Sequence, residues 1–319
     1  MKRSEASMTV FVSTLNQIAV LFSLIAAGFI LAKLGILPEN ASKTLAKLEN
    51  TIFLPALVMG TFIENFTVER IRSAWKILLV SLVMELIAIP VAIGLSRLLA
   101  RDKYTQNIYT YGLCFANFGF MGNAVVSAMF PEIFFEYLIF TLPMWTIIYI
   151  WGVPVLLMSD TETKPTVRSR LKSFANPMLI GMLIGMVIGL FGIPMPRFFT
   201  AVVDSASACM SPVAMILTGV TVLGINVKKT FTDWRIYTAS VVRLVVIPLA
   251  FIGISRLIPV FKDAALFQSA LCALAMPLGI NTIVVPSAYG RDTSAAAGMA
   301  VISHVLSLIT IPIIFSMVG

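Results

Sequence analysis

The segment Gly94-Leu-Ser-Arg-Leu-Leu99 occurs a second time, with only aliphatic exchanges, as Gly253-Ile-Ser-Arg-Leu-Ile258. The two copies are 159 residues apart (253 − 94). A near-constant offset over many further matches indicates that the chain contains two related halves. These matches, at offsets of 157 to 159, are Gly35-Ile36 with Gly192-Ile193, Pro55 with Pro212, Trp75-Lys76 with Trp234-Arg235, Ala88-Ile89-Pro90 with Val246-Ile247-Pro248, Leu113-Cys114 with Leu271-Cys272, and Asn123 with Asn281.

The repeated segments lie in a chain that is too apolar for a soluble protein. Of its 319 residues 59% are hydrophobic and 12% are charged, and the mean hydropathy is +0.96. A soluble domain is about half apolar and a quarter charged. Apolar stretches long enough to cross a bilayer follow one another along the whole chain, which predicts an all-α integral membrane protein with ten transmembrane helices. The stretches are 8–32, 41–63, 73–99, 106–130, 133–158, 175–192, 197–224, 233–258, 264–287 and 292–318.

Each half of the chain therefore holds five spans, in residues 8–158 and 175–319, joined by a polar loop at 159–174. Because five is odd, the second half enters the membrane from the opposite side, which predicts an inverted repeat. Fourteen Lys and Arg residues fall on the side of the 159–174 loop and eight on the side of the termini. The positive-inside rule then places the loop in the cytoplasm and both termini outside the cell membrane. The run from Met8 to Leu31 is too long for a signal peptide, so we expect it to be retained.

Several classes of function find no support in the sequence. The net charge of +8 comes from loops between spans, where lipid headgroups explain it better than nucleic acid. Cys114, Cys209 and Cys272 lie inside apolar spans without metal-ligand spacing. The chain lacks a P-loop and an HExxH motif, so we expect no enzyme activity, no metal and no cofactor.

Spans 4 and 9, which are repeat partners, contain residues that break helices. Span 4 reads Phe115-Ala-Asn-Phe-Gly-Phe-Met-Gly-Asn123, and span 9 reads Ala275-Met-Pro-Leu-Gly-Ile-Asn281, followed by Pro286. Matched interrupted helices are the best sequence indication of a transport site, and helix N-termini at such breaks suit an anion. The alternative is a pair of kinked helices that serve packing alone. In span 4 the break is expected to rest on Gly119, Gly122 and Asn123.

Ionisable residues within the spans are the other candidates for function. Glu85 in span 3 and Arg243 in span 8 are repeat equivalents, and charges at that depth usually face the protein interior. We expect Arg243 either to pair with an acidic group or to attract an anion. Asp204 in span 7 lies either in the interior or at the membrane interface. His304, the single histidine, either titrates or forms a structural hydrogen bond.

At these residues the sequence resembles the auxin efflux carrier family, within the wider superfamily of bile-acid/sodium symporters. The resemblance rests on Asn50-Thr-Ile-Phe-Leu-Pro-Ala-Leu57, Asn117-Phe-Gly-Phe-Met-Gly122, Met276-Pro-Leu-Gly-Ile-Asn281 and Tyr289-Gly-Arg-Asp292. It implies a scaffold of helices 1, 2, 6 and 7, usually dimeric, and a mobile transport unit of helices 3–5 and 8–10. It also implies a small organic anion as substrate, bound where helices 4 and 9 cross, with Asn117 and Asn281 as binding residues. Ala124 departs from the family, which commonly has proline there.

The sequence thus predicts a secondary transporter of a small carboxylate in the lipid bilayer. The resemblance further implies an elevator-type mechanism and a homodimer. An uncoupled uniporter or channel-like facilitator, and a membrane sensor, stay open as alternatives. The coupling ion, H⁺ or Na⁺, is left open as well. The predicted substrate-binding residues are Asn117, Gly119, Gly122, Asn123, Pro277 and Asn281, and the candidates for coupling or charge relay are Glu85, Arg243, Asp204 and His304.

Overall fold

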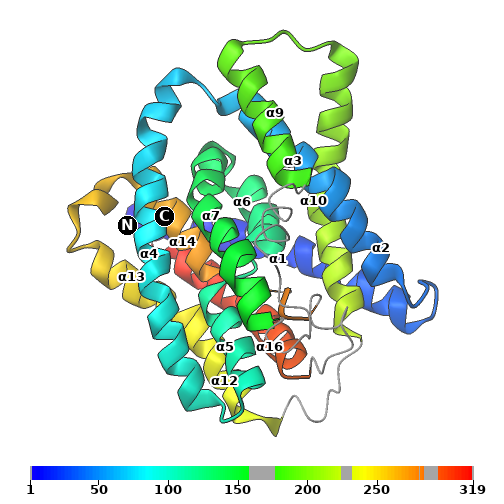
Figure 1. Cartoon of the computed structure of the whole chain (residues 1–319), viewed down its shortest axis with the longest axis vertical. Coiled ribbons are helices and arrows are strands. Elements are labelled where there is room, and N and C mark those ends of the chain that lie inside the picture. The colour runs from blue at the N-terminus through cyan, green and yellow to red at the C-terminus, as the bar shows by residue number, and fades with distance from the viewer. Residues whose placement is uncertain (1, 158–176, 224–231, 280, 284–293, 318–319) are drawn as a thin grey trace.

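A computed structural model describes residues 2–157, 177–223, 232–279, 281–283 and 294–317 (Figure 1). Within these residues every regular element is a helix, and the only β-type pairing is one isolated antiparallel bridge between Ala116 and Leu278. The predicted all-α class is therefore confirmed. The 159–174 loop and Pro286 lie outside the described residues.

The helices of the first half follow the predicted apolar stretches, and three of these stretches contain wider π-helical turns. They are α1 (Lys2–Lys33), α2 (Ala41–Leu48), η1 (Glu49–Phe53), α3 (Leu54–Asn65), α4 (Val68–Leu99), α5 (Lys103–Cys114), η2 (Phe118–Gly122), α6 (Asn123–Met129), η3 (Pro131–Ile133), α7 (Phe134–Ile147) and η4 (Ile148–Leu157).

The second half is helical as well. Its described elements are α9 (Pro177–Phe191), α10 (Arg197–Val222), α12 (Trp234–Val241), η5 (Val242–Val246), α13 (Ile247–Ser255), η6 (Pro259–Lys262), α14 (Ala264–Ala275) and α16 (Ser294–Ser316).

Several of these helices are long and apolar enough to cross a membrane. By length and composition four qualify within the described residues: Ala74–Leu99, Arg197–Thr221, Trp234–Ser255 and Ala295–Ser316. A fifth candidate is a pair, Asn123–Met129 and Pro131–Ile147, with a bend of 116° between its members. The chain is thus a multi-pass membrane protein, while the count of ten spans stays a prediction.

Helix ends in the two halves use the same devices. Gly35 and Gly192 end α1 and α9 with φ angles of 70° and 58°, in the left-handed region that only glycine adopts readily. At helix N-termini, aspartate serves as the cap: the Asp102 side chain accepts from the backbone N–H of Thr105 and caps α5. Asp263 caps α14 by accepting from the N–H of Leu266.

Three prolines inside the spans lie in or next to π-helical turns. Pro55 and Pro248 each come two residues after such a turn ends, and Pro154 lies inside η4. Proline lacks an N–H and clashes with the carbonyl one turn earlier, so a wider turn lets the chain continue without a break.

Two close helix crossings depend on glycine. On α9, glycines 181, 185 and 189 face the backbone carbonyls of Pro55, Met59 and Phe62 on α3. On the other crossing, Gly28 of α1 faces the carbonyl of Ile216, and Gly219 of α10 faces that of Ile25. Small residues at four-residue spacing let membrane helices approach to backbone contact. Helices α3, α9 and α10 accordingly stand together on one side of the molecule (Figure 1).

Helices α4, α5, α7, α12, α14 and α16 form a second group. Helix α4 packs against α5 and α7, α12 packs against α16, and α14 packs against α7. The breaks that follow α5 and α14 lie within this group, where side chains from α5 to α7 are almost completely buried.

Candidate functional site

Helices α5 and α14, in spans 4 and 9, stop at Cys114 and at Ala275, three residues beyond the residue that the repeat pairs with Cys114. The second break has a direct cause, because Pro277 disfavours the helical conformation for Met276, whose ψ is 149°. The first break falls at Phe115–Asn117 and not at the glycines. The expectation that Gly119, Gly122 and Asn123 form the break is therefore wrong: helix resumes at Phe118, and the glycines lie within it.

The non-helical segments that follow α5 and α14 cross in contact with each other. Ala116 and Leu278 form the antiparallel bridge, and the N–H of Asn117 donates to the carbonyl of Pro277 at 2.7 Å. Gly279 makes the approach possible, because a Cβ atom there would lie 3.0 Å from the carbonyl oxygen of Phe115. The break in each helix thus supplies partners for the backbone groups freed by the other.

Gly119 and Gly122 make room for aromatic side chains of α7. A Cβ atom on Gly119 would collide with the indole of Trp145, and one on Gly122 with the hydroxyl of Tyr137. That hydroxyl donates to the carbonyl of Phe118 at 2.9 Å. These glycines therefore fit the helix after the break against α7.

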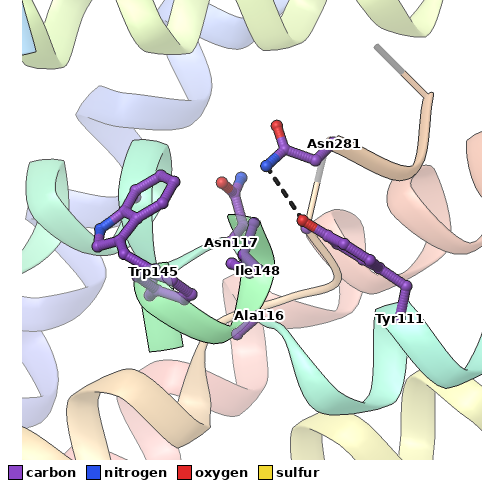
Figure 2. Close-up of a pocket in the computed structure, with 9 residues that line it drawn as sticks. Tyr111, Ala116, Asn117, Trp145, Ile148 and Asn281 are labelled. Carbon is purple, nitrogen blue, oxygen red and sulfur yellow. Dashed lines mark hydrogen bonds between the residues drawn. The ribbon is translucent and has the colours of Figure 1, made fainter. Parts of the chain in front are cut away.

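A pocket opens where these two segments cross (Figure 2). Its cavity volume is about 10 Å³, which is room for about one water molecule. The side chains must therefore move before a substrate enters. None of the lining residues is charged; they are Tyr111, Ala116, Asn117, Phe118, Gly119, Trp145, Ile148, Gly279 and Asn281.

Two asparagines, one from each crossing segment, supply amide groups to this pocket (Figure 2). Asn281 donates from Nδ2 to the hydroxyl of Tyr111 at 3.2 Å. Asn117 is buried, and its Nδ2 lies 3.0 Å from Nε2 of His304. An amide offers both donors and acceptors, so each side chain can bind a polar ligand without carrying charge.

Other predicted binding residues lie beside the pocket and not in its wall. Pro277 contributes its carbonyl to the crossing, and Gly122 packs against Tyr137. Asn123 is buried at the start of α6, and its Oδ1 has no hydrogen-bond partner within the described part of the chain. Asp204 is exposed on α10 and takes no part in the pocket.

Arg243 holds the C-terminal ends of both broken helices. Its guanidinium donates to the carbonyls of Leu113 at 3.1 Å, Ala273 at 3.2 Å and Met276 at 3.3 Å. The carbonyl of Ala273 lacks its helical donor because the residue four positions on is Pro277, which has no N–H. The N–H that would serve Leu113 belongs to Asn117 and is used in the crossing. A cation at two helix C-termini is also favoured by the helix dipoles.

Glu85 is buried near Arg243 but forms no ion pair with it within 4.0 Å; among described residues that distance is reached only by Arg70 and Glu136. Glu85 Oε1 has no hydrogen-bond partner in the described structure. Arg243 therefore binds carbonyl groups in place of the acidic partner that the sequence suggested, and it is not a wall residue of the pocket.

Several residues that matter here are not among those predicted from the sequence. Tyr111, Trp145 and Ile148 line the pocket, but a large apolar side chain in an apolar span carries no distinguishing signal. Glu49 was also missed, although it is completely buried in η1 and neither carboxylate oxygen has a partner within the described residues. Its acidic type within the 41–63 span was a signal that could have been used.

A bundle of apolar helices with two broken segments crossing at a neutral polar pocket defines a membrane protein of the transporter class. The chain matches the family described as membrane transport protein over residues 13–315, nearly its whole length. It therefore belongs to that family, the auxin efflux carriers, and the resemblance seen in the sequence is confirmed. The family is one of transporters and not of enzymes. No curated protein matches the chain significantly.

Proposed function

We propose that the protein is a secondary transporter that binds a small organic anion, a carboxylate, at the crossing of its two broken helices. The observation that carries this proposal is the pocket at the crossing, where Asn117 and Asn281 contribute amide groups from equivalent breaks. Irregular backbone at membrane depth is tolerated only where it is buried or lines a cavity, and here it does both.

Anion binding at a neutral site suits a carrier. Amide and hydroxyl donors such as Asn117, Asn281 and Tyr111 hold a carboxylate by hydrogen bonds that are each worth about 0.5–1.5 kcal/mol. A fixed cation in the wall would bind the anion more tightly and slow its release. The nearest candidate, Arg243, is instead occupied by three backbone carbonyls.

Two inverted five-helix repeats, in ten spans, are the architecture that we propose. The left-handed glycines at 35 and 192 and the capping aspartates at 102 and 263 support it, since each pair marks the same kind of helix end in the two halves. The packing supports it too, because α1 of one half packs on α10 of the other while α9 packs on α3.

We propose an elevator-type movement for this arrangement. Helices 1, 2, 6 and 7 would form the scaffold, and as a homodimer two scaffolds would face each other. Helices 3–5 and 8–10 would carry the pocket across the cell membrane. The termini would lie outside and the 159–174 loop in the cytoplasm, as the distribution of Lys and Arg predicts.

Ligand-induced stabilisation tests the proposal. The purified protein would be heated in mild detergent with potassium acetate, succinate or benzoate, because a ligand that binds the folded state raises the melting temperature. At least one anion is expected to do so in the parent and in Asn40→Asp, an exposed control. Asn117→Asp and Asn281→Asp place a negative charge against the ligand and should abolish the shift. If both variants fold and bind as tightly as the parent, the crossing is not the anion site.

A further inference from the structure

His304 fixes the orientation of the Asn117 amide. The imidazole is buried on α16, with Nδ1 2.6 Å from the carbonyl oxygen of Ala300 and Nε2 3.0 Å from Nδ2 of Asn117. A carbonyl oxygen only accepts, so Nδ1 carries the ring proton. In the neutral ring Nε2 is then the acceptor, and the amide nitrogen of Asn117 must face it. The amide oxygen consequently points away from the ring, with the N–H of Met121 at 3.5 Å.

Protonation of the imidazole reverses this arrangement. A second ring proton on Nε2 would face the NH₂ group of Asn117, so two donors would oppose each other. Rotation of the amide by half a turn removes the conflict with the ring, because the oxygen then accepts from Nε2–H, and it breaks only the long contact with the N–H of Met121. The NH₂ group moves to the position that the oxygen held. Since Asn117 lines the pocket, the wall loses an acceptor and gains donors for an anion.

The surroundings of His304 make a proton there dependent on an anion. Elements α1, α5, α12, α14 and η5 pack against α16. Apart from Glu5 near the start of α1, which lies outside the described side chains, these elements carry no Asp or Glu. A charged imidazole therefore finds no fixed counterion among the described side chains, and an isolated charge within a membrane protein is costly. The titratable and charged groups that they do carry are Lys33, Lys103, Tyr104, Tyr109, Tyr111, Cys114, Arg235, Tyr237, Arg243 and Cys272.

We propose that His304 is the proton-binding residue of the transport cycle and that it takes up one proton together with each carboxylate bound at Asn117. His304 acts as a positioning residue, since it reaches the anion through the Asn117 amide. The proposal rests on the proposed function, because it assigns a coupling ion to the same site. Linkage is reciprocal, so the anion strengthens proton binding as much as the proton strengthens anion binding.

The single histidine allows a direct test by nuclear magnetic resonance of the full-length protein labelled with ¹⁵N-histidine. Without ligand at about pH 7.5, the spectrum should report the Nδ1–H tautomer of a neutral ring. The strongest-binding anion of acetate, succinate and benzoate, added as its potassium salt, should convert the ring to imidazolium. A ring that carries its proton on Nε2, or one that a bound anion leaves neutral, would overturn the proposal.

The pH dependence of affinity provides the second readout. With one proton taken up per anion, the Kd should rise up to about tenfold per pH unit above the titration of the free imidazole. His304→Gln keeps a polar side chain that cannot titrate, so its Kd should be flat between pH 6 and 8. A slope in the variant equal to that of the parent would contradict the proposal. Absence of binding by every anion at every pH would instead reject the proposed function, and the tautomer of the free ring would still test His304.

Discussion

Arg243→Met removes the guanidinium that holds the ends of both broken helices while keeping a side chain of similar length. Three hydrogen bonds to buried carbonyls are lost, those to Leu113, Ala273 and Met276. Hydrogen bonds to a charged group are worth about 1.5–3 kcal/mol each, while relief of the desolvation of the buried guanidinium offsets several kcal/mol. We therefore expect the free energy of unfolding to fall by about 3–5 kcal/mol, the range typical for breaking a buried charged contact.

Equilibrium unfolding of the purified protein in mild detergent, followed by tryptophan fluorescence, measures this loss. Arg256→Met is the matched control, because Arg256 is exposed at the end of α13 and should change stability by less than about 0.5 kcal/mol. Arg243→Lys keeps the charge but not the planar fork of donors, so it should fall between the two. Equal stability of Arg243→Met and the parent would refute the reasoning that the breaks depend on this side chain.

Three further substitutions test other features of the structure. Asp102→Ala removes the cap of α5 and should cost about 1 kcal/mol at pH 7. The backbone N–H of Thr105 lowers the pKa of Asp102, so the carboxylate stabilises above the ordinary value of about 3.9 and the difference from the parent should shrink in unfolding measurements below it. Gly119→Ala places a Cβ atom 2.5 Å from the Trp145 ring, and we expect overpacking to cost about 1–3 kcal/mol and to weaken anion binding in titrations. Glu49→Gln removes a buried carboxylate without a described partner, and it should raise the melting temperature at about pH 8.

Each of these changes has a control or an opposing outcome. Asp102→Ser restores a capping oxygen and should recover most of the lost stability. Gly94→Ala lies in a helix with open space around the new methyl group, so it should be neutral or stabilising. A Glu49→Gln protein that melts well below the parent would mean that the carboxylate has a partner that stabilises it.

Much of the fold could be predicted because it depends on local chemistry. The length of the apolar stretches, the matched offsets and the prolines predicted helices where α4, α10 and α16 occur. The predicted breaks in spans 4 and 9 lie within a few residues of the observed ends of α5 and α14. The break in span 4 was misplaced because glycine was taken as its cause. The structure ends α5 at Cys114, where the backbone turns to pair with the other break, and such pairing leaves no mark in the local sequence.

The site was less predictable than the fold for a similar reason. Asn117 and Asn281 stood out as polar residues in broken spans, and both line the pocket. Trp145 did not, because its importance comes from the space that Gly119 leaves on another helix. The role of Arg243 depends on a donor that is absent four residues after Ala273, so it becomes visible only when both segments are placed in space.

The hydrogen bond between the N–H of Asn117 and the carbonyl of Pro277 joins two pieces of main chain. Every substitution of Asn117 except proline keeps the backbone N–H that donates this hydrogen bond. We call the backbone of the two crossing segments the frame of the pocket. The frame does not depend on the side chains of Tyr111, Trp145 and Ile148, which lie on other segments and form part of the pocket wall. Wall residues can be exchanged one at a time while the frame persists. A selection experiment for new carboxylate cargoes should accordingly begin with these three positions and leave the crossing residues untouched.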